Sequence, residues 1–316
     1  MGRAAKWCPW LFGAVFPLLL FSACSAAVRH TESGDRFKAE GNIESAIAEY
    51  ERAIAADPAY GPAYCSLGKA LMLKGDAPRA AEWLQKGIGV QPDDAPLRNC
   101  LGTALLLAGE PGRAEEEFLR ALEIHPAHDR AAENLFNLVI DYGAVSIDSV
   151  AAVFEARAKA NPTDVHALGQ YARILAMKQN FDSAVSFAER AVAIKPESPE
   201  AWADSGFVFL AQGNHLEAAK SFRAAIERAP QNAEYRKMLA SALLKAGQVS
   251  EALVTIQQMI QMSPSDPHAF FLLGEVYGRL GEFGKAKEAY QQALKYNLRP
   301  DLRQELARKL LQLSEH

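Results

Sequence analysis

Long runs of like charge are missing from this 316-residue sequence, which has no stretch rich in lysine and arginine and no block of five charges of one sign. A nucleic-acid-binding surface usually shows the first feature, and a charged disordered tail shows the second. The net charge is −4, and removal of the segment before Cys24, with Arg3 and Lys6, would leave −4 − 2 = −6. We therefore expect no nucleic-acid partner.

Cysteine is also scarce. The four cysteines are Cys8, Cys24, Cys65 and Cys100, too few and too scattered for a disulfide-based scaffold. Hydrophobic residues make up 49% of the chain and charged residues 23%. This composition is typical of a protein with an ordinary apolar core.

Motifs for catalysis are absent as well. The stretch KGIGVQP lacks the Lys-Ser/Thr pair of a phosphate loop, and no serine lies in the strand-turn-helix context of a nucleophile. His125, His128 and Asp129 could bind a metal, but there is no second cluster of ligands. We predict a non-enzymatic protein with no metal, no cofactor and no small-molecule substrate.

The amino terminus has the order of an export signal. Residues 1–6 are short and positive, residues 7–28 carry no charge, and residues 10–21 form the apolar centre. A membrane-spanning helix needs about 20 apolar residues, whereas this run is shorter, with Pro9 directly before it and Pro17 within it. Two outcomes remain open from the residues alone: cleavage after Ala27, giving a secreted or periplasmic protein, or an uncleaved single-pass anchor.

A third outcome comes from FSAC, residues 21–24, which resembles a bacterial lipobox, although Phe21 stands where leucine is usual. The resemblance implies a signal peptide over 1–23, and a lipidated (palmitate-bearing) Cys24 that opens a short tether over 24–30. Ser25, rather than Asp, favours an outer-membrane lipoprotein that faces the periplasm. We adopt this prediction over the other two.

Prolines recur at a fixed interval. Steps of 34 residues separate Pro58, Pro92 and Pro126, and then Pro162, Pro196, Pro230 and Pro264. Only the step from Pro126 to Pro162 differs, at 36 residues. A fixed period of this size indicates a stacked solenoid.

Each interval carries the same anchors. One copy contains Trp202, Gly206, Phe209, Gly213, Ala218, Phe222, Ala225 and Pro230. This order resembles the tetratricopeptide repeat (TPR) pattern W-x2-L-G-x2-Y, then A-x3-F, then P. The resemblance implies an all-α, right-handed solenoid of helix-turn-helix hairpins over 27–298, in about eight repeats. Residues 299–316 are amphipathic and fit a capping helix that shields the last hairpin.

The copy at 129–164 is divergent. It has Phe136 at the small-residue position, Val150 at the alanine position, and two extra residues. Either it stacks as a degenerate repeat, or it changes the pitch locally and divides the array into sub-arrays of three and four regular repeats.

In TPR proteins, partners usually lie along the concave face, which the first helix of each repeat lines. Repeat phasing places there the candidate binding residues Cys65, Lys69, Met72, Asn99, Thr103, Leu106, Arg173, Met177, Phe207, Leu210, Lys237, Phe271 and Arg279. The matching positions do not hold the Lys and Asn clamp that some chaperone-binding members use for a terminal carboxylate. Apolar patches between isolated charges suit an amphipathic helix or an extended peptide; alternatively, the apolar residues pack against neighbouring repeats.

Cys65 and Cys100 fall on the first helices of adjacent repeats. Helices pack about 8–10 Å apart, whereas bridged cysteines need Cα atoms within about 7 Å. A disulfide is an open alternative in an oxidising compartment, but these distances favour two buried thiols, which we predict.

Fold does not fix function. The resemblance to bacterial TPR lipoproteins implies a protein–protein interaction scaffold of the envelope, in pilus-secretin or outer-membrane assembly. The alternatives are a membrane-anchored co-chaperone and an accessory subunit of a polysaccharide synthase or glycosyltransferase complex. The partner itself is not predicted.

Overall fold

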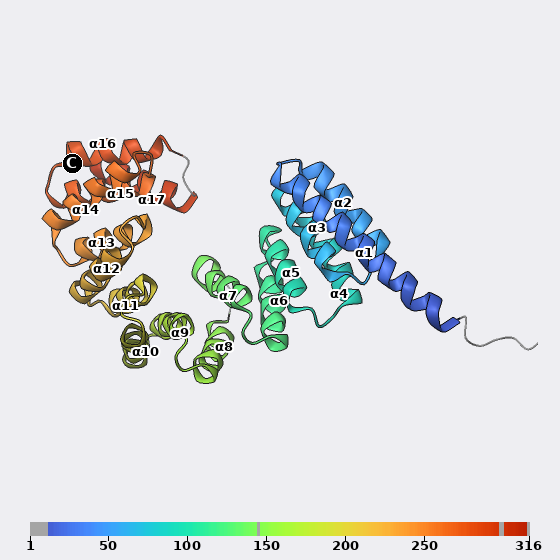
Figure 1. Cartoon of the computed structure of the whole chain (residues 1–316). Coiled ribbons are helices and arrows are strands. Elements are labelled where there is room, and N and C mark those ends of the chain that lie inside the picture. The colour runs from blue at the N-terminus through green and yellow to red at the C-terminus, as the bar shows by residue number, and fades with distance from the viewer. Residues whose placement is uncertain (1–11, 144–145, 297–299, 315–316) are drawn as a thin grey trace, which may run out of the picture. The chain divides into compact units, whose positions relative to one another are not determined.

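The described part of the chain is almost entirely α-helical. The computed structural model describes residues 12–143, 146–296 and 300–314, and within these ranges it has 17 α-helices and no β-strand (Figure 1). The helices are α1 (Phe12–Ala39), α2 (Ile43–Ala56), α3 (Gly61–Leu73), α4 (Ala77–Val90), α5 (Ala95–Leu107), α6 (Pro111–Ile124), α7 (Asp129–Tyr142), α8 (Ile147–Ala160), α9 (Val165–Met177), α10 (Phe181–Ile194), α11 (Pro199–Gln212), α12 (His215–Arg228), α13 (Ala233–Lys245), α14 (Val249–Met262), α15 (Pro267–Arg279), α16 (Phe283–Leu294) and α17 (Pro300–Ser314).

The helices form two compact units, Met1–Val150 and Ala151–His316, and the boundary falls inside the divergent copy. In unit 1, consecutive helices pair as the hairpins α1/α2, α3/α4 and α5/α6, and each hairpin contacts the helix that follows. In unit 2, the hairpins α9/α10, α11/α12, α13/α14 and α15/α16 stack in the same way. The predicted all-α repeat solenoid is confirmed.

In several repeats the first helix has a glycine where an aromatic ring of the second helix packs against its backbone. A Cβ atom added to Gly102 would lie 2.5 Å from the ring of Phe118, and one added to Gly206 would lie 2.7 Å from Phe222. Phe118 is completely buried. Because the ring lies directly on the glycine, the two backbones approach closely, and a larger residue would overpack the hairpin.

The turn between the two helices of a repeat requires a left-handed residue. Glycine fills this position with a positive φ, for example Gly213 at 84°, as the sequence predicted. In the repeat at 165–198, however, Gln179 takes the same conformation with φ of 61°. A side chain in this region costs about 1–2 kcal/mol relative to the right-handed helix.

Replacing Gln179 by glycine should therefore stabilise unit 2. We expect Gln179→Gly to raise the free energy of unfolding by about 0.5–1 kcal/mol, because relief of strain exceeds the added freedom of the unfolded chain. Urea denaturation followed by circular dichroism measures the change. Gly213→Ala, at the matching turn of the next hairpin, should lose about 1 kcal/mol; a Gln179→Gly variant no more stable than wild type would contradict this account.

Helix α1 is twice as long as its partner α2, and its first half projects beyond α2 (Figure 1). It runs without interruption from Phe12 through Cys24 to Ala39. The predicted short tether at 24–30 is thus helical rather than extended, because no proline or glycine lies between Cys24 and Thr31. Its six steps span about 9 Å instead of the roughly 20 Å of an extended chain. Residues 1–11 of the predicted signal peptide, and the side chain of Cys24, lie outside the described part of the chain.

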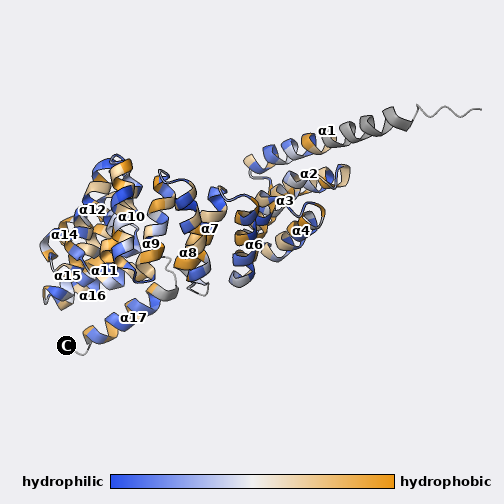
Figure 2. Ribbon diagram, turned by 90° about the horizontal axis from the view of Figure 1, so that it is seen from below, coloured by the Kyte–Doolittle hydropathy of each residue, from blue (hydrophilic) through white to orange (hydrophobic). Residues whose placement is uncertain are grey.

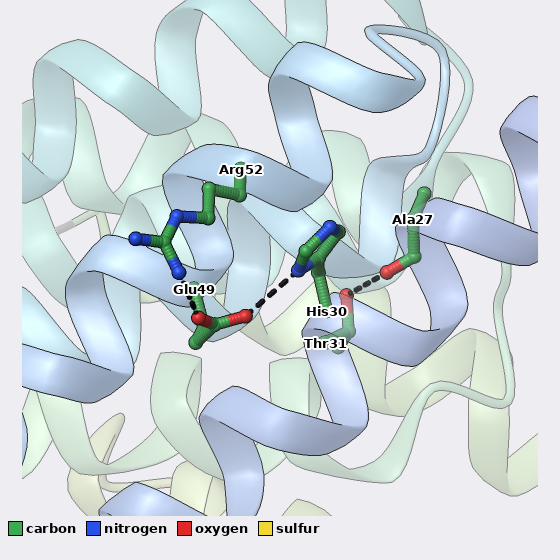
Figure 3. Close-up of polar contacts among 5 residues, drawn as sticks. All are labelled: Ala27, His30, Thr31, Glu49 and Arg52. Atoms are coloured by element: carbon green, nitrogen blue, oxygen red, sulfur yellow. Dashed lines mark hydrogen bonds and ion pairs between the residues drawn. The ribbon is translucent and has the colours of Figure 1, made fainter.

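Side-chain contacts hold the described part of α1 against α2. Thr31 Oγ1 donates to the carbonyl oxygen of Ala27 at 2.9 Å, and His30 Nδ1 lies 2.7 Å from a carboxylate oxygen of Glu49 on α2 (Figure 3). Arg52 pairs with the other oxygen of that carboxylate. Helix α1 is therefore bonded to α2 within six residues of Cys24. None of the described helices combines the length and the apolar character needed to cross a bilayer.

Helix α17 packs on the last hairpin. Leu302 and Leu306 are buried in one apolar cluster with Ala286 and Tyr290 of α16. Hydrophilic and hydrophobic residues alternate along α17 (Figure 2). Its apolar side thus covers the end of the core that the next repeat would otherwise cover.

Candidate binding groove

The first helices of successive repeats contact one another in both units. These contacts join α1 to α3, α3 to α5 and α5 to α7 in unit 1, and α9 to α11 and α13 to α15 in unit 2. Several predicted binding residues, among them Cys65, Asn99 and Arg173, lie where two first helices meet. We call the surface that the first helices share the inner face of each unit.

A disulfide joins Cys65 of α3 to Cys100 of α5, with Cα atoms 5.8 Å apart. The prediction of two buried thiols is therefore wrong, and the less favoured alternative, a disulfide, is present. It compared the distance between helix axes with a distance between Cα atoms, although Cα atoms lie about 2.3 Å from the axis of a helix. Two residues on facing sides of packed helices are therefore closer than the axes, and they come within bridging range.

Polar side chains connect the next helix pair of unit 1. Asn134 Nδ2 of α7 donates to Asn99 Oδ1 of α5 at 2.9 Å and lies 3.4 Å from Thr103 Oγ1. Thr103 Oγ1 itself donates to the backbone carbonyl oxygen of Asn99 at 3.0 Å. The sequence predicted Asn99 and Thr103 on this face but missed Asn134. Asn134 lies one repeat after Cys100, and this spacing could have placed it on the same face.

Lys69 of α3 is exposed on the same face. Desolvation lowers the pKa of Lys69, and the positive charges of Arg130 and Lys38 lower it further, while Asp35 opposes them. Asp35 is already engaged, since it pairs with Lys38 at 2.7 Å and accepts a hydrogen bond from Tyr50 at 2.7 Å. Lys69 therefore places on the inner face of unit 1 a positive charge that forms no ion pair with another described residue.

Apolar side chains lie one helical turn further along α3 and α5. Met72 and Leu106, both predicted binding residues, are half-buried. Their neighbours Leu73 and Leu107 are 66% and 61% exposed. Packing against adjacent repeats therefore does not account for Leu73 and Leu107.

An ion pair marks the inner face of unit 2. Arg173 Nη1 of α9 lies 3.4 Å from Asp204 Oδ1 of α11, and its guanidinium lies 4.5 Å from the ring centroid of Phe207. A Cβ atom on Gly169 would lie 2.1 Å from Asp204 Oδ2, so this glycine makes room for the pair. Burial raises the pKa of Asp204, although Arg173 acts to lower it. The sequence predicted Arg173 and Phe207 but missed Asp204, one turn before Phe207.

Most of the remaining predicted residues of unit 2 interact with other residues of the same unit. Lys237 pairs with Glu234 at 2.6 Å, and Arg279 donates to the carbonyl oxygen of Leu244. Leu210 and Phe271 are half-buried against the apolar clusters, and Phe271 lies 5.9 Å from Tyr290 between ring centroids. Met177 is half-buried at the end of α9.

Metal ligation finds no support among the residues that the structure describes, which contain no group of three or more potential ligands. His128 has a structural role instead. Its Nδ1 accepts a hydrogen bond from the backbone N–H of Ala131 at 3.1 Å and caps α7.

Family models match most of the repeat array. Models of the tetratricopeptide repeat match residues 61–94, 148–199, 209–273 and 267–299, and a TPR repeat model matches residues 34–75.

Two solved structures have the same fold. A tetratricopeptide repeat protein from Parabacteroides merdae has a TM-score of 0.62 at 17% identity, covering 91% of this chain and 99% of that one. Pseudomonas aeruginosa pilF has a TM-score of 0.53 at 14% identity, covering 83% of this chain and 99% of that one.

Two curated proteins of Arabidopsis thaliana share shorter segments. The Protein CTR9 homolog is 30% identical over 125 residues, which are 39% of this chain and 11% of that protein. The TPR repeat-containing thioredoxin TTL4 is 34% identical over 103 residues, 33% of this chain and 15% of that protein. This chain thus matches only a small part of their length.

Proposed function

We propose that this chain, which is a tetratricopeptide repeat protein, is a non-enzymatic scaffold that binds segments of partner proteins on its inner faces. TPR repeats generally mediate protein–protein interaction. The observation that carries the proposal is the exposure of Leu73 and Leu107 beside Lys69 on the inner face of unit 1. Neighbouring apolar side chains left exposed next to charge are typical of an interaction surface.

We further propose that the protein works in the bacterial envelope, anchored by lipid on Cys24. Two observations support this location. The Cys65–Cys100 disulfide suits an oxidising compartment such as the periplasm, and the structural likeness to Pseudomonas aeruginosa pilF suits a bacterial protein. An anchor at Cys24 would hold the array close to the membrane surface, since His30, six residues later, already contacts Glu49 of α2.

Labelling with radioactive palmitate tests the anchor. The wild-type protein should incorporate label, and Cys24→Ala should not. Absence of label from the wild type would overturn the lipoprotein proposal and favour a secreted or single-pass anchored protein.

Retention of partners from a detergent extract of the native membranes tests the scaffold role. A Leu73→Asp/Leu107→Asp variant should lose proteins that the immobilised wild-type chain retains, because it places charge on the inner face. Val90→Asp is the control, since Val90 is an exposed apolar residue of the second helix α4 in the same unit. Equal loss from both variants would contradict binding at the inner face. Co-retained synthase or glycosyltransferase subunits would favour the accessory-subunit role, and co-retained chaperones the co-chaperone role.

A further inference from the structure

The inner face of unit 1 holds two cations, Lys69 and Arg130, that form no ion pair with another described residue. Lys69 lies on α3 and Arg130 on α7, and both are exposed. Within the described residues, neither takes part in an ion pair. By contrast, the basic residue Arg98 of the same unit, on α5, is paired with Glu117 at 2.8 Å.

Three successive first helices hold these cations in a fixed frame. Each contributes two residues one turn apart, which therefore share a face of their helix: Cys65 and Lys69 on α3, Asn99 and Thr103 on α5, and Arg130 and Asn134 on α7. The Cys65–Cys100 disulfide links α3 to α5, and the bonds of Asn134 to Asn99 and Thr103 link α7 to α5.

The bonds that join α3, α5 and α7 therefore fix the helices that carry the two cations. Burial lowers the pKa of Lys69, and the positive charge of Arg130 lowers it further. Asp35 is the described carboxylate that acts on Lys69 in the opposite direction, and it is already paired with Lys38. Glu133, one turn after Arg130, is exposed and forms no ion pair with it among the described residues. An added carboxylate would relieve this repulsion.

An apolar track runs beside the cationic one. Met72 and Leu73 follow Lys69 by about one turn of α3, and Leu106 and Leu107 follow Thr103 by one turn of α5. The inner face of unit 1 thus presents two parallel rows, one cationic with amide and hydroxyl groups and one aliphatic.

We propose that the inner face of unit 1 binds an acidic segment of a partner protein in which paired aliphatic residues alternate with glutamate or aspartate. Carboxylates of the segment accept hydrogen bonds from Lys69 and Arg130, and its aliphatic side chains cover Leu73 and Leu107. This inference rests on the proposed scaffold function and specifies the chemistry of its partner.

Fluorescence anisotropy with a defined probe tests it. The probe is a fluorescein-labelled synthetic peptide that repeats Leu-Leu-Glu-Glu, titrated with the full chain in mild detergent; a Leu-Leu-Lys-Lys peptide is its charge-reversed control. Lys69→Ala and Arg130→Ala should each weaken binding of the acidic peptide by up to about fivefold, and the double variant by about tenfold or more. Lys86→Ala, which removes an exposed cation from the second helix α4, should leave the affinity unchanged. Added salt should weaken binding of the acidic peptide.

The proposal is overturned if the double variant binds the acidic peptide within about twofold of wild type, or if the lysine peptide binds equally well. It is also overturned if wild type does not bind the acidic peptide. In that last case the scaffold function stands as long as Leu73→Asp/Leu107→Asp still loses partners that Val90→Asp retains, so the two failures are distinguishable. Circular dichroism confirms that each variant keeps its helices.

Discussion

Phe118→Ala is expected to lower the free energy of unfolding of unit 1 by about 3–5 kcal/mol. Phe118 is fully buried, and its ring lies against Gly102 of the paired helix. Removing the ring leaves a cavity that the hairpin α5/α6 cannot close, since Gly102 has no side chain with which to fill it. Because neighbouring repeats share their interface, the loss should spread to the adjacent hairpin α3/α4.

Hydrogen–deuterium exchange at peptide resolution measures this effect within the intact chain. We expect faster exchange across α3 to α6 in Phe118→Ala, and unchanged exchange in Leu107→Ala, which removes an exposed leucine from the same hairpin. Equal exchange in the two variants would show that the ring on Gly102 does not hold the hairpin together.

Loss of the Cys65–Cys100 disulfide should have the second-largest effect. The bridge spans a sequence separation of 35 residues. A loop of this length stabilises the folded state by about 3–4 kcal/mol, largely by restricting the unfolded chain. The Cys65→Ser/Cys100→Ser variant should therefore unfold at lower urea concentration than the oxidised wild type.

Reductant supplies the control for this comparison. Dithiothreitol should lower the urea midpoint of the wild type towards that of the double serine variant, and it should leave the variant unchanged. A wild-type midpoint that does not respond to reductant, with both thiols found free by alkylation and mass spectrometry, would contradict the bridge.

Most of the fold could be predicted from the repeat period. Prolines 34 residues apart, with a glycine and an aromatic residue at fixed positions between them, predicted the stacked hairpins, and the Gly102–Phe118 contact shows why both residue types are needed. The glycine turns were also predictable, because a left-handed residue must end the first helix of each hairpin. Gln179 takes the left-handed conformation without being glycine. The turn between the helices therefore requires this backbone conformation whichever residue occupies it.

The contacts on the inner face were harder to predict. The repeat period shows which residues are equivalent in successive repeats, but it does not show which of them touch across two repeats. Asn134 and Asp204 act through residues on the preceding first helix, Asn99 and Arg173 respectively. These pairs are 35 and 31 residues apart, on either side of the period. The offset depends on how two helices cross, which the pattern of one repeat does not specify. The Cys65–Cys100 bridge was missed for a related reason, since facing Cα atoms lie closer than helix axes.

The central claim is that partners bind the inner faces. Its most direct test is photo-crosslinking in cells from single defined positions. Benzoylphenylalanine in place of Leu107 or Phe207 samples the inner faces of units 1 and 2, and in place of Lys86 it samples a second helix. We predict that irradiation yields adducts with other proteins from the first two positions and none from Lys86. Adducts from Lys86 alone, or equally from all three positions, would contradict the account.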